Sequence, residues 1–389
     1  MTTESTLAQA AGAPEQAAGI GLALSGGGFR ATLFHLGSLI RLNELGHLGR
    51  LSEITSVSGG SIAAGLLGLR WSRLGFDGEG HAAHLQREVV EPLRRFCSRT
   101  VDIGAILKGW LNPFTSPVEL LRDVYDARLF DGATLQDLPK PSEGPRFTLY
   151  ATNLQTGVSV RFSQPYMAEY RLGEVRTPAI PLATAVAASS AFPPLLVPLA
   201  LRLEAGQWSR FEGADLYDHV NLRTTMLLGD GGIYDNMGLE RVWNRYPTVL
   251  VSDAGAKLKL EERGRCLRRS QVARTMRTLD ITIEQSRALR KRKLVDDFVR
   301  GVRGGAYWGI ATEIDHYGLE TAGLPPPIVH DDAITRSMAG IRTRLNRFTD
   351  EEQGRLINWG YALTDAAMRR HVLGRDAVPG KLPVPEHPL

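Results

Sequence analysis

The chain has 389 residues, of which 43% are hydrophobic and 23% charged, with a net charge of +4. This length allows one large domain or two ordinary ones, and the composition is that of a globular protein with a substantial core. The small positive charge predicts at most a weak preference for anionic surfaces. Only Cys97 and Cys266 occur, without metal-ligand spacing, which indicates a reduced cytoplasmic setting.

The first 18 residues are rich in Ala, Gln, Thr and Gly, and we expect them to form a disordered tail. They contain neither a basic leader nor an apolar core, so we expect no secretory signal peptide. No apolar run reaches the ~20 residues that a membrane span needs.

The first ordered elements repeat a strand, a glycine turn and a helix. Ile20–Leu24 (IGLAL) is a predicted strand, and residues 29–46 carry apolar side chains at helical spacing. Glu53–Val57 and Ile62–Leu69 repeat the same order. This alternation predicts an α/β fold, a three-layer sandwich around a mainly parallel central sheet.

The rest of the chain carries further predicted elements without an internal repeat or a long linker. The expected strands are Arg146–Asn153, Val158–Phe162, Met226–Leu228 and Thr248–Ser252, and the expected helices are Ala183–Ser189 and a capped helix from Thr349 to about Val372. The polar segment Glu204–Arg223 is interpreted as an irregular surface excursion. We therefore predict a single domain over residues 19–375, followed by an extended, Pro-rich tail over 376–389.

The sequence Ser25-Gly26-Gly27-Gly28-Phe29-Arg30 joins the first strand to the first helix. Consecutive glycines there let backbone N–H groups converge at the positive end of the helix, which suits an oxyanion hole or a phosphate cradle equally. A tight turn without function is the third interpretation. Neither a Walker-type Gly-Lys-Ser/Thr nor a GxGxxG spacing accompanies it.

The sequence TSVSGGSIAAG contains three serines at the end of the second strand. A nucleophile elbow needs small residues two positions before and after the serine. Ser58 satisfies this with Ser56 and Gly60, whereas Ser56 would follow bulky Ile54 and Ser61 would already lie within the helix. Ser58 is therefore the candidate nucleophile, and a simple helix cap is the alternative.

Asp230 begins a third segment, DGGIYDN, directly after the apolar run MLLG. We expect it at the carboxyl end of a strand, the edge at which open α/β sheets place their sites. Asp-Gly-Gly is also common in ordinary turns. Together the three segments supply a nucleophile, a carboxylate and oxyanion donors, the parts that acyl transfer requires.

With these segments in this order, the sequence resembles the patatin-like phospholipase family, which is related to the catalytic domain of cytosolic phospholipase A2. The matching blocks are SGGGFR, SVSGGS, ATNLQTG, AASSAFPP and DGGIYDN, within residues 19–253. Beyond about residue 256 the likeness is to bacterial members only. The resemblance implies a patatin-like fold and a Ser58–Asp230 dyad, with the N–H groups of Gly26, Gly27 and Gly28 as the oxyanion hole.

Two positions depart from the family pattern, because Ser25 replaces an acidic residue and Ser56 replaces the first glycine of the elbow. For Arg30 the family pattern suggests contact with the lipid phosphate or a brace for the glycine loop, and a simple bond to a backbone carbonyl is an equal alternative. His35 lies within the first helix and is interpreted as a packing residue, not as a third catalytic member.

A basic stretch over residues 263–303 contains thirteen Lys or Arg and four acidic residues. It is interpreted either as a peripheral membrane contact or as a solvated helix face. The segment VDIGAILKGWLNPF (101–114) suits a lid or an interfacial helix, and a buried core helix is the alternative. No nucleic-acid motif accompanies the basic stretch, so we expect no nucleic-acid partner.

The sequence thus predicts a serine acyl hydrolase acting on phospholipid or another acyl ester through an acyl-enzyme. We expect no cofactor and no metal, because no cluster of metal-ligating residues is present. The alternatives are a soluble esterase or thioesterase, a non-catalytic lipid-binding protein of the same fold, and more remotely a nucleotide-binding protein. The oligomeric state is left open.

Overall fold

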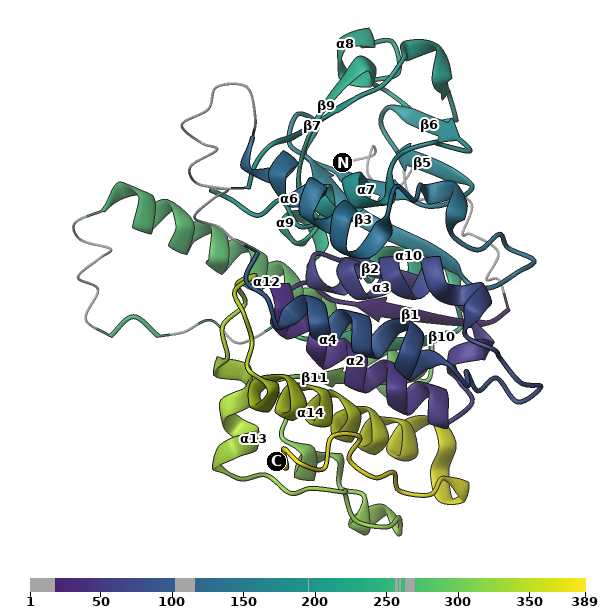
Figure 1. Ribbon diagram of the computed structural model, residues 1–389, viewed down its shortest axis with the longest axis vertical. Coiled ribbons are helices and arrows are strands. Elements are labelled where there is room, and N and C mark those ends of the chain that lie inside the picture. The colour runs from purple at the N-terminus through teal and green to yellow at the C-terminus, as the bar shows by residue number, and fades with distance from the viewer. Residues whose placement is uncertain (1–17, 102–115, 195, 256–257, 259, 263–269) are drawn as a thin grey trace.

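The computed structural model describes the chain apart from residues 1–17, 102–115, 195, 256–257, 259 and 263–269 (Figure 1). The predicted tail 1–18, the proposed lid segment 101–114 and the start of the basic stretch therefore lie almost wholly outside the described residues.

A single sheet runs through the molecule in the order β11-β10-β1-β2-β3-β4-β5-β6-β8, with β9 joining β3 to β7 (Figure 1). The five strands from β11, at one edge, to β3 are all parallel, and the remaining pairs are antiparallel. The strands are β1 (Ile20–Leu24), β2 (Leu51–Val57), β3 (Arg146–Asn153), β4 (Ser159–Phe162), β5 (Tyr166–Glu169), β6 (Gly173–Arg176), β7 (Leu199–Arg202), β8 (Trp208–Ser209), β9 (Thr225–Asp230), β10 (Thr248–Asp253) and β11 (Gly304–Gly309).

Helices cover both faces of the parallel strands. The helices are α2 (Gly28–Glu44), α3 (Gly59–Arg70), α4 (Glu91–Cys97), α6 (Pro117–Tyr125), α7 (Leu182–Ser189), α8 (Val220–Thr224), α9 (Gly232–Asp235), α10 (Glu240–Arg245), α12 (Gln271–Val299), α13 (Ala333–Ser337) and α14 (Asp350–Met368). None of the helices described combines the length and the apolar character needed to cross a bilayer.

Alternation along β1 explains the three layers. Leu22 and Leu24 point into the larger core with α2, α3 and α14, whereas Ala23 joins a second core that includes Val242 of α10 and Leu294 of α12. Successive side chains of a strand point to opposite faces, so a fully apolar strand such as IGLAL must be covered on both. The three-layer α/β arrangement predicted from the sequence is confirmed.

Most predicted elements are present with small differences in their bounds. The strands Ile20–Leu24 and Arg146–Asn153 have the predicted bounds, and the helix predicted from Ile62 begins at Gly59. The capping box at Thr349 is present, and the helix that it opens is α-helical to Met368 and continues as a π-helical turn to Leu373.

The prediction for Glu204–Arg223 is wrong in part. This segment contains the short strand β8, which pairs with β6, and its Trp208 is buried. The Trp208 indole N–H donates to the carbonyl of Arg223 at 2.9 Å, a bond between the first part and the end of this segment. A single buried aromatic among polar residues gives no periodic signal, so the pattern alone did not indicate a strand.

The last residues of the chain pack against α14. The Asn358 side chain donates to the carbonyls of Val384 and His387, both at 2.8 Å, and Val384 is buried. The Pro-rich segment therefore lies along a helix in an extended form, with its backbone groups bonded to a buried amide.

Helices α2 and α14 approach each other through glycine. A Cβ atom on Gly37 would lie 1.9 Å from the carbonyl oxygen of Ile357, and one on Gly360 would lie 1.9 Å from that of Phe34. Backbone atoms in packed helices cannot move aside as the end of a side chain can. The two glycines therefore set the distance between these helices.

We expect Gly37→Ala to destabilise the protein by about 1–3 kcal/mol, because the added methyl forces α2 and α14 apart. Urea unfolding of the variant and the wild type measures this difference. Gly78→Ala is the matched control, since its Cβ would have no atom within 4 Å. Equal unfolding midpoints for the two variants would contradict the close approach.

Candidate active site

Ser58 is the single residue between β2, which ends at Val57, and α3, which begins at Gly59. Its φ is 50° and its ψ −118°, a conformation that residues other than glycine rarely adopt. Such local strain persists only where the surrounding structure fixes it, and it is concentrated at functional sites. The turn therefore has the strained geometry of a nucleophile elbow.

Hydrogen bonds separate the three serines of this segment. Ser56 and Ser61 are fully buried, and their hydroxyl oxygens lie 3.0 Å apart. The Ser61 hydroxyl also bonds that of Ser189 at 2.9 Å, and the Ser189 oxygen accepts the N–H of Ser58 at 2.9 Å. Ser56 and Ser61 thus hold the elbow in place, and the Ser58 hydroxyl takes no part in this chain of hydrogen bonds.

Ser189 is a residue that the sequence reasoning missed. The block AASSAFPP was part of the family pattern, but no site residue was assigned to it. In the fold, the Ser189 carbonyl also accepts the N–H of Gly231, and the Ala191 carbonyl accepts that of Asp230. This short segment therefore connects the elbow with the Asp-Gly-Gly turn, a contact that only the tertiary structure reveals.

Asp230 ends strand β9, as predicted, but that strand runs antiparallel to β3. Strand β2 pairs with β3 up to Val57, opposite Tyr150, and Asp230 lies opposite the next residue, Ala151. Strand β4 pairs with the same part of β3, so it occupies the other edge. Strand β9 therefore continues along the edge that β2 leaves, and Asp230 meets Ser58 where the two strands end.

The Asp230 carboxyl is held in place and is almost inaccessible, with 2% exposure. The N–H of Gly232 donates to its Oδ1 at 2.7 Å. Burial raises the pKa of Asp230 to about 7, while the Gly232 N–H and the neighbouring Ser58 side chain act in the opposite direction as hydrogen-bonding partners. A carboxylate with such a pKa is a far better base at neutral pH than one in water.

The glycine loop lies against the elbow. A Cβ on Gly26 would lie 3.3 Å from that of Ser58, and a Cβ on Gly59 would lie 2.0 Å from the carbonyl oxygen of Gly28. Gly27 and Gly28 have φ of 143° and 57°, which favours glycine at both positions. The loop and the elbow can approach this closely only without side chains.

The N–H groups of the loop differ in what they bind. Gly26 donates its N–H to the carbonyl of Asn236 at 2.9 Å, so its expected place in the oxyanion hole needs correction. In the part of the chain that the structure describes, the N–H groups of Gly27 and Gly28 have no protein acceptor. These two, at the start of α2, remain as the candidates for oxyanion donors beside Ser58.

His35 supports the glycine loop from within the core and does not contact the dyad through a hydrogen bond among the described residues. Its Nε2 lies 2.9 Å from the carbonyl oxygen of Ser25, and its Nδ1 lies 2.8 Å from the Ser252 hydroxyl. Burial lowers the pKa of His35 to about 4, so the ring is neutral at physiological pH. It then donates Nε2–H to Ser25 and accepts from Ser252.

Arg30 is buried, and its guanidinium donates to three backbone carbonyls. The acceptors are Ala254 at 2.8 Å, Ile341 at 2.8 Å and Ala339 at 3.3 Å. With 4% exposure, Arg30 joins the first turn of α2 to the end of β10 and to the segment before α14. This geometry is that of a brace for the loop.

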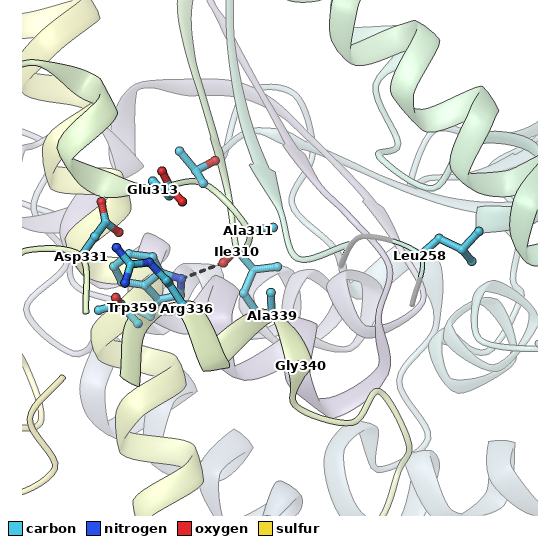
Figure 2. Close-up of a pocket in the computed structure, with 11 residues that line it drawn as sticks. Leu258, Ile310, Ala311, Glu313, Asp331, Arg336, Ala339, Gly340 and Trp359 are labelled. Carbon is cyan, nitrogen blue, oxygen red and sulfur yellow. Dashed lines mark hydrogen bonds between the residues drawn. The ribbon is translucent and has the colours of Figure 1, made fainter. Parts of the chain in front are cut away.

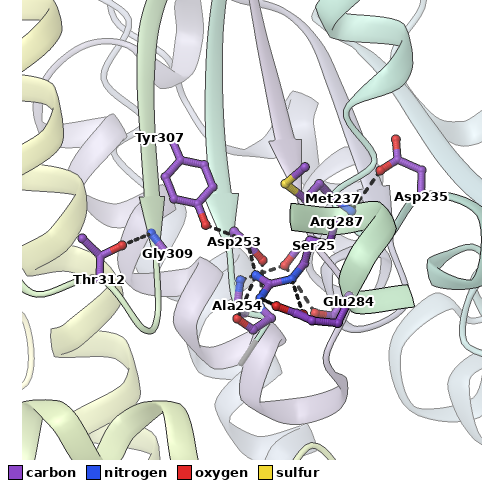
Figure 3. A network of polar contacts seen from close by, with 12 residues as sticks. Ser25, Asp235, Met237, Asp253, Ala254, Glu284, Arg287, Tyr307, Gly309 and Thr312 are labelled. Carbon is purple, nitrogen blue, oxygen red and sulfur yellow. Dashed lines mark hydrogen bonds and ion pairs between the residues drawn. The ribbon is translucent and has the colours of Figure 1, made fainter. Parts of the chain in front are cut away.

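A buried ion pair at the end of β10 adds a second support (Figure 3). The Asp253 carboxylate accepts from Arg287 of α12, from the Tyr307 hydroxyl at 2.7 Å and from the N–H of Gly255 at 2.8 Å. Burial opposes ionisation, but the Arg287 charge and these donors hold the pKa of Asp253 below its usual value. The adjacent Ala254 N–H donates to the Ser25 hydroxyl at 2.7 Å, which connects this pair to the glycine loop.

A cavity of about 380 Å³ lies elsewhere, between the end of β11 and helices α13 and α14 (Figure 2). Trp359, whose indole N–H donates to the carbonyl of Ile310, forms part of its wall. Neither Ser58 nor Asp230 lines it, and we assign it no role in the chemistry of the dyad. The described residues also contain no group of three or more His, Cys, Asp or Glu arranged to hold a metal ion.

Comparison with solved structures gives remote similarities. Human GIVD cytosolic phospholipase A2 in complex with methyl gamma-linolenyl fluorophosphonate and terbium chloride is 14% identical, with a TM-score of 0.48 over 90% of this chain and 58% of that chain. VipD from Legionella pneumophila is 16% identical, with a TM-score of 0.35 over 90% of this chain and 66% of that chain. The chain thus spans less than two thirds of the length of either. A search of the curated proteins gives no match.

The family comparison is more specific. A family model described as patatin-like phospholipase matches residues 22–243, more than half of the chain. The matched range includes the glycine loop, Ser58, Ser189 and Asp230. This match confirms the resemblance inferred from the sequence blocks, and the chain belongs to the patatin-like phospholipase family.

Proposed function

We propose that the protein is a serine acyl hydrolase of the phospholipase A or lysophospholipase type, which cleaves fatty-acyl esters of membrane lipids. The observation that carries this proposal is the placement of Ser58, on a strained turn with its side chain beside the buried Asp230 carboxyl. Membership of the patatin-like phospholipase family supports a lipid acyl ester as the substrate.

In the first half of the proposed reaction, Ser58 Oγ attacks the ester carbonyl carbon and its proton passes to the Asp230 carboxylate. The oxygen that becomes negative accepts hydrogen bonds from the N–H groups of Gly27 and Gly28. Collapse of the tetrahedral intermediate breaks the ester C–O bond, and the leaving alcohol takes the proton from Asp230. The product is an acyl-enzyme on Ser58.

In the second half, Asp230 takes a proton from water, and the resulting hydroxide attacks the acyl carbonyl. The bond to Ser58 breaks, the serine oxygen regains the proton from Asp230, and the fatty acid leaves. No further base is required, because burial brings the pKa of Asp230 to about 7.

Two alternatives differ in substrate or in chemistry. A soluble esterase or thioesterase would act equally on monomeric and vesicle-bound esters, whereas a lipid hydrolase should accelerate at the interface. A non-catalytic lipid-binding protein would not react with a fluorophosphonate probe at Ser58. The strain at Ser58 favours an enzyme, because a binding protein gains nothing from a serine in this conformation.

For membrane contact we propose one face of α12. Arg277, Ile281, Arg292, Val295 and Val299 share this face at helical spacing, and the three apolar residues are exposed. The opposite face is docked through the buried Leu294, the ion pair of Arg287 with Asp253, and the Trp243 indole N–H, which donates to the Asp297 carboxylate at 2.8 Å. Cations beside exposed apolar side chains are typical of a helix that lies on an anionic membrane surface.

We expect Ser58→Ala to lower kcat on phospholipid and p-nitrophenyl acyl esters by about 10³-fold or more, because the nucleophile is lost. Ser337→Ala is the matched control and should keep the activity, since this serine is exposed on α13 and its hydroxyl bonds only the carbonyl of Ile334. Hydrolysis rates and mass spectrometry of fluorophosphonate labelling measure both. Full activity of the Ser58 variant would refute the dyad.

We expect Asp230→Asn to abolish hydrolysis and yet to gain stability relative to the wild type as pH rises. The folded pKa is about 7 and lies above the ordinary value of 3.8, so folding favours the protonated carboxyl. That contribution is complete below pH ~4 and is lost as pH rises through ~7, by an amount on the order of a few kcal/mol. Urea unfolding of both proteins at pH 5 and pH 8 measures it, and a pH-independent difference would contradict the buried base.

Removing two cations with Arg277→Gln and Arg292→Gln should weaken binding to vesicles containing phosphatidylserine by about 10- to 30-fold, from ~1 kcal/mol for each cation. Arg128→Gln, an exposed change on another element, is the control. Sedimentation with vesicles at low and high salt measures the affinity. Unchanged binding of the double variant would exclude this face as the contact.

A further inference from the structure

A second cavity, of about 320 Å³, lies between β3, β4 and α10. All of the residues that line it carry polar side chains, among them Tyr150, Ser159, Arg161, Glu240, Arg241 and Arg245. Neither member of the dyad is among the lining residues, and the proposed reaction uses none of these side chains.

The strand register explains how these groups come together. Tyr150 of β3 is directly opposite Arg161 of β4 in an antiparallel pair, so the two side chains are on one face of the sheet. Ser159 precedes Arg161 by two residues and is on the same face. Helix α10 contributes Glu240, Arg241 and Arg245 to the wall. The floor of the cavity is therefore rigid sheet.

Two donors in this cavity are buried without a partner. Tyr150 is 1% exposed, and within the described part of the chain its hydroxyl oxygen has no hydrogen-bond partner. Burial raises the pKa of Tyr150 well above its usual value, so the hydroxyl stays protonated and can donate. The Nε of Arg245 is likewise buried and unpartnered. A buried donor without an acceptor destabilises the fold, and a bound acceptor would relieve that cost.

The charges of the cavity also favour an anion. Arg161 is half-buried and makes no hydrogen bond or ion pair with the described residues, while Arg241 is occupied by the buried Glu53. Glu240 is the one acidic residue of the lining, and the Arg161 charge acts on its carboxyl. With Arg241 paired to Glu53, Arg161 and Arg245 face Glu240 alone, so positive charge remains in excess next to neutral hydroxyl donors.

We propose that this cavity is a binding site for a phosphate-bearing anion, held by the guanidinium groups of Arg161 and Arg245 and by the hydroxyl of Tyr150. The planar guanidinium fork matches two phosphate oxygens at once, and the Tyr150 hydroxyl supplies a donor to a third. The volume lies within the range of small-ligand pockets, about 300–1,000 Å³. The phosphate comes either from a free small molecule or from the headgroup of an anionic phospholipid.

The first experiment titrates inorganic phosphate and glycerol phosphate into the full chain by isothermal calorimetry. We expect wild-type binding that weakens about tenfold or more in Arg161→Gln, from the loss of charged hydrogen bonds. Tyr150→Phe, which removes one oxygen, should weaken it about three- to tenfold. Arg176→Gln, exposed and paired with Glu174 at the surface, is the control and should bind as the wild type does.

Circular dichroism establishes that each variant is folded, and if Arg161→Gln fails to fold, Tyr150→Phe decides. Vesicles with and without phosphatidic acid distinguish the two sources of phosphate. Vesicle binding that depends on Arg161 and is displaced by free phosphate assigns the headgroup, and vesicle binding unaffected by Arg161→Gln assigns a free phosphate. No binding of phosphate by the wild type at about 10 mM, or equal affinity in Arg161→Gln and the control, would overturn the proposal.

Discussion

The geometry of the candidate site depends on one edge of strand β3. Strand β2 occupies that edge as far as Tyr150, and β9 takes over from Ala151 in the opposite direction. Two chain ends that meet head to head along a shared edge are fixed by the spacing of the ladder, and no loop flexibility enters. Ser58 and Asp230, the proposed nucleophile and base, are therefore positioned by backbone hydrogen bonds, before any side chain is considered.

The cost of this arrangement falls on Asp230. A carboxyl in a buried site is a stronger base because ionisation is opposed, and the same opposition destabilises the ionised folded state. One hydrogen bond from Gly232 and the nearby Ser58 offset part of that cost. Ser58, in turn, holds an unfavourable φ. Both members of the proposed dyad thus occupy states that the rest of the fold must stabilise. The Ser56–Ser61–Ser189 hydroxyls do so on one side, and His35, Arg30 and Asp253 on the other.

Local patterns predicted a large part of this fold and site. Ile20–Leu24 was evident as a short apolar run ahead of a glycine turn, and Arg146–Asn153 as a stretch of aromatic and β-branched residues. Ser58 was selected by the small residues Ser56 and Gly60 on either side of it. In the structure a Cβ on Gly60 would lie 2.5 Å from the carbonyl oxygen of Leu24, so this position has no room for a side chain. In these cases the residues that determine the structure are adjacent in sequence.

What the sequence did not reveal depends on distant partners. The direction of β9 follows from its pairing with β3. The Gly26 N–H is not available to an oxyanion because it donates to the Asn236 carbonyl. Ser189 contacts Ser61 and Ser58, which lie 128 and 131 residues away in the sequence. The short strands β5, β6 and β11 lack a clear period of two, because turns, glycines and charges interrupt them. No local pattern encodes such pairings.

The pairing of Asp253 with Arg287 has a mechanical consequence. A buried carboxylate that loses its cation is stranded in a medium of low polarity, so this contact resists separation far more than a surface ion pair would. Dissolved salt weakens the attraction between surface charges, but it screens a buried pair much less. Helix α12 is thus fixed to the end of β10 at Asp253, the residue before Ala254, whose backbone bonds Arg30 and Ser25 of the glycine loop. Helix α12 is uninterrupted from Gln271 to Val299, so a force applied to its exposed face would be transmitted through Arg287 and Asp253 to the sheet.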